Sequence, residues 1–134
     1  MTAKKEFLRP ELRAAIAAAL DKQAADITLL DLEGLGAFTS HFLLCTGFSA
    51  RQVEAICDEI EQKLEENGMR LRHREGKPDG DWMLLDFGGL IVHVFTEHAR
   101  RFYDLERLWR AARRVELDIP GESSRFPSAA EAEG

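Results

Sequence analysis

Two apolar runs that meet at a pair of glycines, residues 82–95, constrain the fold of this chain more than any other stretch. Gly88-Gly89 between such runs predicts a β-hairpin in which both turn residues adopt positive φ. A turn of two residues also fixes the register, so that Phe87 pairs with Leu90 and Trp82 pairs with Phe95. One side of this hairpin is then wholly apolar, which predicts that it faces the core.

The other side of the hairpin mixes large apolar side chains with one carboxylate and one imidazole, because side chains alternate along a strand. Its members are Trp82, Leu84, Asp86, Ile91, His93 and Phe95. This composition is typical of a contact surface. For Trp82 itself, a core position and a partly exposed anchor at an interface are about equally consistent with the sequence.

Composition sets the class of protein. The 134 residues fit one domain, and a hydrophobic content of 45% is enough for a core. The formal charge of −6 makes the chain as a whole a poor generic binder of nucleic acid. Cys45 and Cys57 show no CxxC spacing, which favours reduced, buried thiols in a cytoplasmic protein. No stretch approaches the roughly 20 apolar residues of a membrane span, and the short alanine-rich run at 14–20 is not expected to be a signal peptide.

The periodicity of apolar residues predicts one α/β (α+β) domain over residues 10–117, with a mixed sheet of about five strands flanked by helices. Helices are expected at 10–24, at 49–68 and after Thr96 with a break at Tyr103-Asp104; strands are expected at 26–32, 41–46, 69–75 and in both hairpin arms. Ser49 and Gln52 fit a capping box at the start of the second helix. Residues 1–9 are expected to form a flexible terminus, and 118–134 a disordered tail with too little apolar content to fold.

Candidate catalytic arrangements are weak. Asp86 and His93 are expected to lie diagonally across the hairpin, but the sequence places no nucleophile beside them, so a structural hydrogen bond is the favoured interpretation. The Thr46-Gly-Phe-Ser49 stretch lies before a helix but matches neither glycine-rich phosphate motif. The histidines and glutamates match no zinc pattern, so no metal and no cofactor is expected.

Arginines gather near the end of the chain, at Arg100, Arg101, Arg107, Arg110, Arg113 and Arg114. They could contact RNA phosphates. A solvated helix face, balanced by nearby carboxylates, is at least as good an interpretation.

Several motifs in a fixed order strongly resemble the ribosomal silencing factor (Iojap) family. They lie at residues 41–56, 75–76, 82–88, 92–95 and 103–109, and the likeness spans about 10–116. The resemblance implies an α/β domain related to the nucleotidyltransferase fold, usually a homodimer, without catalysis. It also implies binding to the fourteenth protein of the large ribosomal subunit, which blocks joining of the small subunit sterically and represses translation.

Carried over by position, the resemblance implies a ribosome-facing surface that includes Trp82, Leu84 and Asp86. Other positions match family motifs but are equally consistent with structural roles: His93, Tyr103, Leu105 and Trp109. Asp81, Glu75 and Gly76 are expected at the rim of the surface. Two alternatives stay open at this point, namely residual nucleotide binding or transfer on the same fold, and a dimeric RNA-binding adaptor that works through the arginines.

Overall fold

The computed structural model describes residues 8–117 and 119 of the chain. The expected flexible terminus and disordered tail therefore lie outside the described residues, apart from residues 8, 9 and 119. The elements, in chain order, are α1 (Pro10–Asp21), β1 (Ala25–Asp31), β2 (His41–Gly47), α2 (Ala50–Glu66), β3 (His73–Gly76), β4 (Trp82–Asp86), β5 (Leu90–Thr96), α3 (Glu97–Tyr103), α4 (Leu105–Leu108) and β6 (Arg113–Val115). No helix in this part of the chain is long and apolar enough to cross a membrane.

The strands form one mixed sheet in the order β3-β4-β5-β2-β1-β6. Only β2 and β5 pair in parallel; the other neighbours are antiparallel. This confirms the expected α/β class, with six strands in place of about five. The strand that the sequence did not predict is β6, whose three residues pair with β1 at the edge of the sheet. Two of the three are arginines, which show no alternating apolar pattern.

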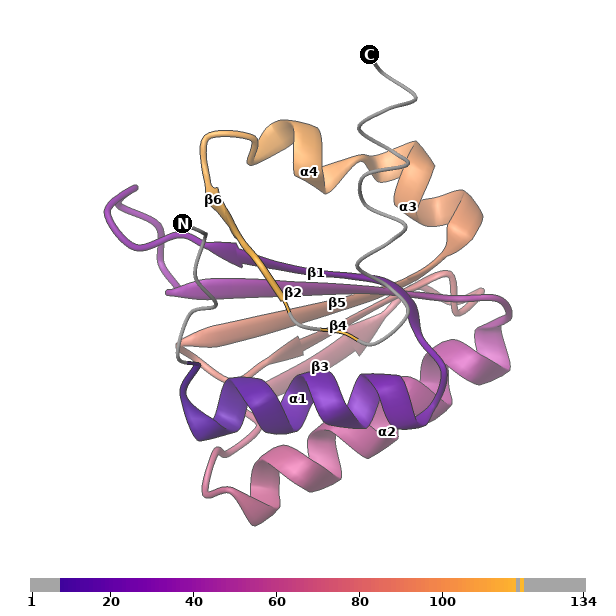
Figure 1. Cartoon of the computed structure of the whole chain (residues 1–134). Coiled ribbons are helices and arrows are strands. Elements are labelled where there is room, and N and C mark those ends of the chain that lie inside the picture. Colours follow the sequence, from indigo (N-terminus) through magenta and orange to yellow (C-terminus); the bar gives the residue numbers. More distant parts are fainter. Residues whose placement is uncertain (1–7, 118, 120–134) are drawn as a thin grey trace.

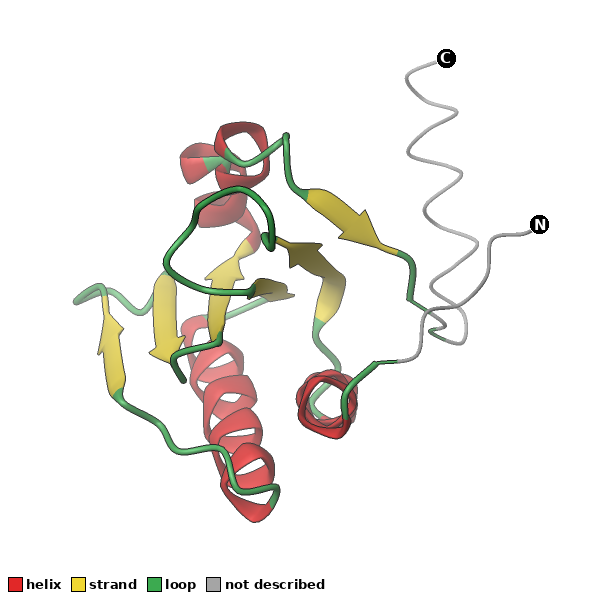
Figure 2. Cartoon of the chain, turned by 90° about the vertical axis from the view of Figure 1, so that its left-hand side faces the viewer, coloured by secondary structure: helices red, strands yellow, loops and turns green. Residues whose placement is uncertain are grey.

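The sheet has helices on both sides (Figures 1 and 2). Helices α1 and α2 pack against one side, which we call the α2 face, and α3 and α4 lie on the other, which we call the α3 face. The larger core fills the α2 face, where the apolar stripe of α2 is fully buried: Val53, Ile56, Cys57, Ile60 and Leu64. Each such side chain contributes roughly 1.5–3 kcal/mol by leaving water, so this stripe anchors the helix to the sheet.

The hairpin pairs in the predicted register, with Trp82 opposite Phe95 and Leu85 opposite Val92. The expectation that both turn glycines have positive φ is wrong, because only Gly88 does, at +92°. Positive φ at the first central residue alone is the pattern of a type II′ turn, which also suits the twist of two strands.

The start of α2 is capped as the sequence predicts, with one difference. The Ser49 hydroxyl accepts a hydrogen bond from the Gln52 amide at 3.1 Å. The Gln52 side chain accepts from the amide of Phe48 at 2.7 Å, one residue earlier than in a standard capping box. Its amide nitrogen also donates to the carbonyls of Lys22 and Gln23, so this glutamine joins the α2 cap to the turn after α1.

The α3 face is covered over only part of its width. Helix α3 packs over β5 and β2, and α4 follows it after a break at Asp104, whose φ is +50°. The Thr96 hydroxyl caps α3, whereas the Asp104 side chain makes no capping bond to α4. A second, smaller core lies under these helices: Leu30, Leu32, Phe42, Leu44, Ile91, Phe95 and Ala99.

Strand β3 is an edge strand, and it begins later than expected, at His73. Its side chains alternate, with Arg74 half-buried and His73 exposed. Arg74 reaches Asp58 at 3.0 Å and Glu61 at 2.9 Å on α2. The other side of β3 therefore belongs to the α3 face.

Candidate functional site

The α3 face is left uncovered over β3 and β4, and we call this part the open strip. Its side chains come from paired positions of the two strands: His73, Glu75, Trp82, Leu84 and Asp86. The three residues of β4 are half-buried, whereas the two of β3 are exposed. Leu84 is half-buried and packs against the smaller core. The open strip thus presents apolar area flanked by charge, on a rigid sheet.

Trp82 lies where the open strip meets α3. Its indole contacts Tyr103 of α3 at a ring-centroid distance of 4.5 Å and Phe95 of β5 at 5.1 Å. Its indole N–H donates to Nδ1 of His93 at 3.1 Å. The Lys77 ammonium lies 5.2 Å from the centroid of the Tyr103 ring, so the β3–β4 loop also reaches this cluster. Trp82 is therefore neither sealed in the core nor a free anchor: it supports α3 and keeps part of its ring exposed.

His93 lies beneath Trp82 and is 5% exposed. Because its Nδ1 accepts from the indole, the neutral ring carries its proton on Nε2, which is buried without a hydrogen-bond partner in the described part of the chain. The Phe42 ring lies against the imidazole at 4.8 Å, nearly perpendicular to it. Burial lowers the pKa of His93 to about 4, so the ring is uncharged near neutral pH.

The expected hydrogen bond between Asp86 and His93 does not form. One carboxylate oxygen of Asp86 instead accepts from the amide of Gly88 at 2.8 Å and holds the hairpin turn. The Asp86 carboxylate is thus engaged at the turn, while Nε2, the nitrogen of His93 that carries the donor proton, stays without a partner in the described residues. No acid–base pair is therefore assembled on this face.

The expected rim residues lie within the open strip, as Glu75 does, or beside it. The backbone carbonyl of Asp81 accepts from the Thr96 amide at 2.9 Å, which ties the β3–β4 loop to the start of α3. Glu75 is exposed and pairs with His73 at 2.9 Å. At Gly76 an added Cβ would come within 2.2 Å of the Met83 sulfur, so the close approach of β3 to β4 there needs glycine or a shift of Met83.

The motif positions on the last helices separate into two groups. Leu105 and Trp109 turn inward and pack on the smaller core, where the Trp109 ring lies 5.3 Å from that of Phe42. Tyr103 is 37% exposed and borders the open strip through Trp82. Sequence reasoning missed Phe102 and Leu108, which are 72% and 73% exposed. Only a helical-wheel analysis of residues 97–109 could have found them, and the break at Asp104 disrupts its period.

Three kinds of candidate reactive site give no support for catalysis in the described residues. Before α2, the amides of Phe48 and Gln52 are already bonded within the cap. Burial raises the pKa of both Cys45 and Cys57 to about 12, so neither thiol is a nucleophile at neutral pH. Residues 8–117 and 119 contain no group of three or more His, Cys, Asp or Glu side chains placed to hold a metal.

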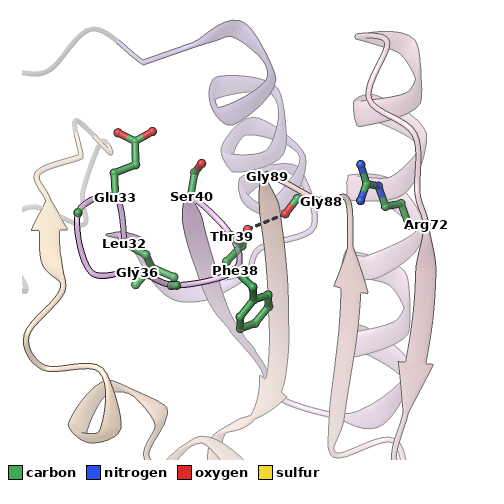
Figure 3. Close-up of a pocket in the computed structure, with 11 residues that line it drawn as sticks. Leu32, Glu33, Gly36, Phe38, Thr39, Ser40, Arg72, Gly88 and Gly89 are labelled. Atoms are coloured by element: carbon green, nitrogen blue, oxygen red, sulfur yellow. Dashed lines mark hydrogen bonds between the residues drawn. The ribbon is translucent and has the colours of Figure 1, made fainter.

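A shallow hollow of about 520 Å³ lies at the other end of the hairpin, between the turn and the loop that joins β1 to β2. Thr39 closes one side by donating to the Gly88 carbonyl at 2.8 Å (Figure 3). Figure 3 shows Arg72 beyond the hairpin turn and Glu33 on the opposite side of the hollow, with the 75% exposed Phe38 between them. One carboxylate and one guanidinium that do not converge give the hollow no chemistry of its own.

Comparison with known proteins places these features in a family. The family model described as "Ribosomal silencing factor during starvation" matches residues 5–134. The chain is similar to the ribosomal silencing factor RsfS of Bacillus subtilis, with 43% identity over 108 residues, which cover 81% of this chain and 92% of the relative. It is also similar to the chloroplastic protein Iojap of Arabidopsis thaliana, with 33% identity over 105 residues, covering 78% of this chain and 44% of that protein.

A solved structure shares the same fold. A crystal structure of a protein from Chromobacterium violaceum superposes with a TM-score of 0.73 at 32% sequence identity. The match covers 85% of this chain and 92% of that protein. The arrangement of helices and sheet is thus common to both.

Proposed function

The chain belongs to the ribosomal silencing factor family, and on that premise we propose that its open strip docks onto the fourteenth protein of the large ribosomal subunit. The bound domain then excludes the small subunit and represses translation. Members of this family act on the ribosome as regulators and not as enzymes, which confirms the expectation of no catalysis. Membership of this family therefore removes residual nucleotidyl transfer from the alternatives.

One observation carries this proposal: β4 presents half-buried apolar side chains on a sheet whose other apolar surfaces are covered. Leu84 and the exposed part of the Trp82 ring would form the centre of the contact, with Tyr103 beside them. Because the indole N–H is already bonded to His93, Trp82 offers the partner its ring surface and not a hydrogen bond. Asp81, Asp86 and Glu75 would form a polar rim, the usual arrangement around an apolar interface centre.

The mechanism that follows is competition for one surface of the large subunit. A folded domain that sits there excludes the small subunit by volume, so no covalent step is needed. Its affinity and concentration set the fraction of large subunits that are blocked, through simple mass action. We also propose the cytoplasm as its location, because this is where bacterial ribosomal subunits meet.

The open strip is tested by replacing Leu84 with aspartate. Leu84 is half-buried at the margin of the smaller core, so its replacement should remove binding without removing the fold. We expect affinity for isolated large subunits to fall by about 30-fold, which corresponds to roughly 2 kcal/mol at an interface centre. Fluorescence titration of labelled protein with large subunits measures this, and circular dichroism checks the fold.

The matched control is Leu35→Asp, which makes the same chemical change at a 43% exposed leucine in the loop between β1 and β2. This variant should bind as the wild type does. Equal affinities for Leu84→Asp and the wild type would refute docking through the open strip.

The family resemblance also leads us to propose a homodimer. The measurement is the molar mass in solution by multi-angle light scattering at micromolar concentration. We expect twice the mass of the chain. A mass equal to that of one chain throughout this concentration range would contradict the proposal.

A further inference from the structure

The charge of the chain is unevenly distributed. Between Glu97 and Val115 lie six arginines and three carboxylates, a net charge of +3. Since the whole chain carries −6, the remainder carries −9. Such an asymmetry between parts of one domain is an indication of an anionic partner for the basic part.

Most arginines of this segment are engaged within the protein. Arg100 is bonded to Glu106 at 2.7 Å, and Arg114 reaches the same carboxylate at 3.3 Å. Arg101 pairs with Glu97 at 3.4 Å, and Arg113 pairs with Asp31 at 2.6 Å.

Two arginines differ from the others, and we call them the α4 arginines: Arg107 and Arg110. Both are exposed, and neither has an ion pair or side-chain hydrogen bond in the part of the chain that the structure describes. They flank the 73% exposed Leu108 on α4 and the turn after it. Two unpaired guanidinium groups therefore stand next to an exposed apolar side chain.

The α4 arginines stand on a fixed support. Leu105 and Trp109, which alternate with them along the chain, pack into the smaller core under α4. Glu106 is tied to α3 through Arg100. The α4 arginines are therefore held on the outer side of the segment, and α4 lies on the same face of the sheet as the open strip (Figure 1). A body that contacts the open strip can thus also reach α4.

We propose that the α4 arginines bind backbone phosphates of ribosomal RNA next to the docked ribosomal protein. The guanidinium group suits phosphate because its planar fork donates two parallel hydrogen bonds. The inference rests on the proposed function, because the open strip brings the domain to the large subunit. An acidic protein surface would also attract arginines, but phosphate is the dominant anion of a particle built largely of RNA. The protein contact selects the site, and the phosphate contacts add affinity and fix the orientation.

The test is the salt dependence of binding to isolated large subunits, measured for the wild type and for Arg107→Gln/Arg110→Gln between 50 and 200 mM KCl. Each phosphate contact contributes about one to the slope of log affinity against log salt. We expect the slope of the double variant to be smaller by about two. Its binding should also be weaker than that of the wild type at the lowest salt concentration. Its affinity for the isolated fourteenth protein should be unchanged.

The matched control is Arg51→Gln/Arg70→Gln, which removes the same charge from two exposed arginines elsewhere in the chain. Its slope should equal that of the wild type. An unchanged slope for the α4 double variant would overturn the RNA contact while leaving the docking proposal intact. If the α4 double variant lost as much affinity for the isolated fourteenth protein as for large subunits, the arginines would contact that protein and not RNA. This result would also overturn the inference. Absence of wild-type binding to large subunits would overturn both proposals.

Discussion

Replacing Arg100 with alanine is expected to lower the free energy of unfolding by about 3–5 kcal/mol, the cost of removing one partner of a buried ion pair. The Arg100 side chain is only 11% exposed. Its guanidinium donates to both oxygens of Glu106, to the hydroxyls of Thr28 and Thr46, and to the carbonyl of Asp26. These bonds join α3 and α4 to β1 and β2.

The loss is large because two of the groups left behind are buried hydroxyls and a third is a half-buried carboxylate. Thr28 and Thr46 are 4% and 1% exposed, and Arg100 lowers the pKa of Glu106 against the opposing effect of burial. Without the guanidinium, the Asp26 carbonyl at the bulged strand loses its donor, and the Glu106 carboxylate keeps the more distant Arg114 at 3.3 Å. An unsatisfied buried polar group costs about 1–3 kcal/mol by itself.

Urea denaturation at pH 7 measures the effect, with Arg101→Ala as the control. Arg101 follows directly in the same helix, but its side chain is 70% exposed and its pair with Glu97 lies in solvent. This control should change the free energy of unfolding by no more than about 0.5 kcal/mol. If both variants lost the same small amount, Arg100 would not be the joint between the helices of the α3 face and the sheet. Should the alanine variant fail to fold, Arg100→Lys takes its place in the comparison. It keeps the positive charge but not the planar guanidinium group, so its free energy of unfolding should lie below that of the wild type and above that of the alanine variant.

Acidification is expected to destabilise the protein by about 3 kcal/mol between pH 7.5 and pH 4 through His93 alone. In the unfolded chain this imidazole takes up a proton near pH 6.5, whereas in the folded protein burial lowers its pKa to about 4. Between these values the unfolded state binds more protons, so stability falls as the pH falls. Below pH 4 both states are protonated, and His93 adds no further loss. Protonation of Nδ1 would also break its bond to the Trp82 indole.

The variant His93→Asn isolates this contribution, because its side-chain oxygen can still accept from the indole but does not titrate in this range. Urea unfolding of both proteins across the range should show a loss for the wild type that exceeds the loss for the variant by about 3 kcal/mol. The pKa of His41 is also lowered, mainly by burial. Because His41 is present in both proteins, its contribution cancels when their losses of stability are compared. Parallel pH profiles for the two proteins would contradict the assignment.

The hairpin register could be predicted from sequence because a two-residue turn leaves one pairing, and the structure confirms it. Two features could not be predicted in this way. Strand β6 has three residues without apolar alternation, so only its pairing with β1 defines it. The hydrogen-bond partners of His93 and Asp86 were the second, because the sequence does not give the side-chain positions that direct the Trp82 indole to His93 and the Gly88 amide to Asp86.

The extent of the open strip could likewise not be predicted from the sequence. Apolar alternation showed that β4 and β5 share a mixed face, but not that α3 and α4 cover β5 and leave β4 open. Arg100 explains this placement, since its bonds hold α3 toward β1 and β2. The surface that we propose for ribosome binding is thus a consequence of where one buried arginine anchors a helix.

The most direct test of this account is sedimentation of the protein with a mixture of isolated large and small subunits through a sucrose gradient. We expect the wild type to travel with the large subunit and to reduce the peak of joined ribosomes, whereas Leu84→Asp stays at the top of the gradient and leaves that peak unchanged. A wild-type protein that remained at the top, or that sedimented with joined ribosomes, would contradict it.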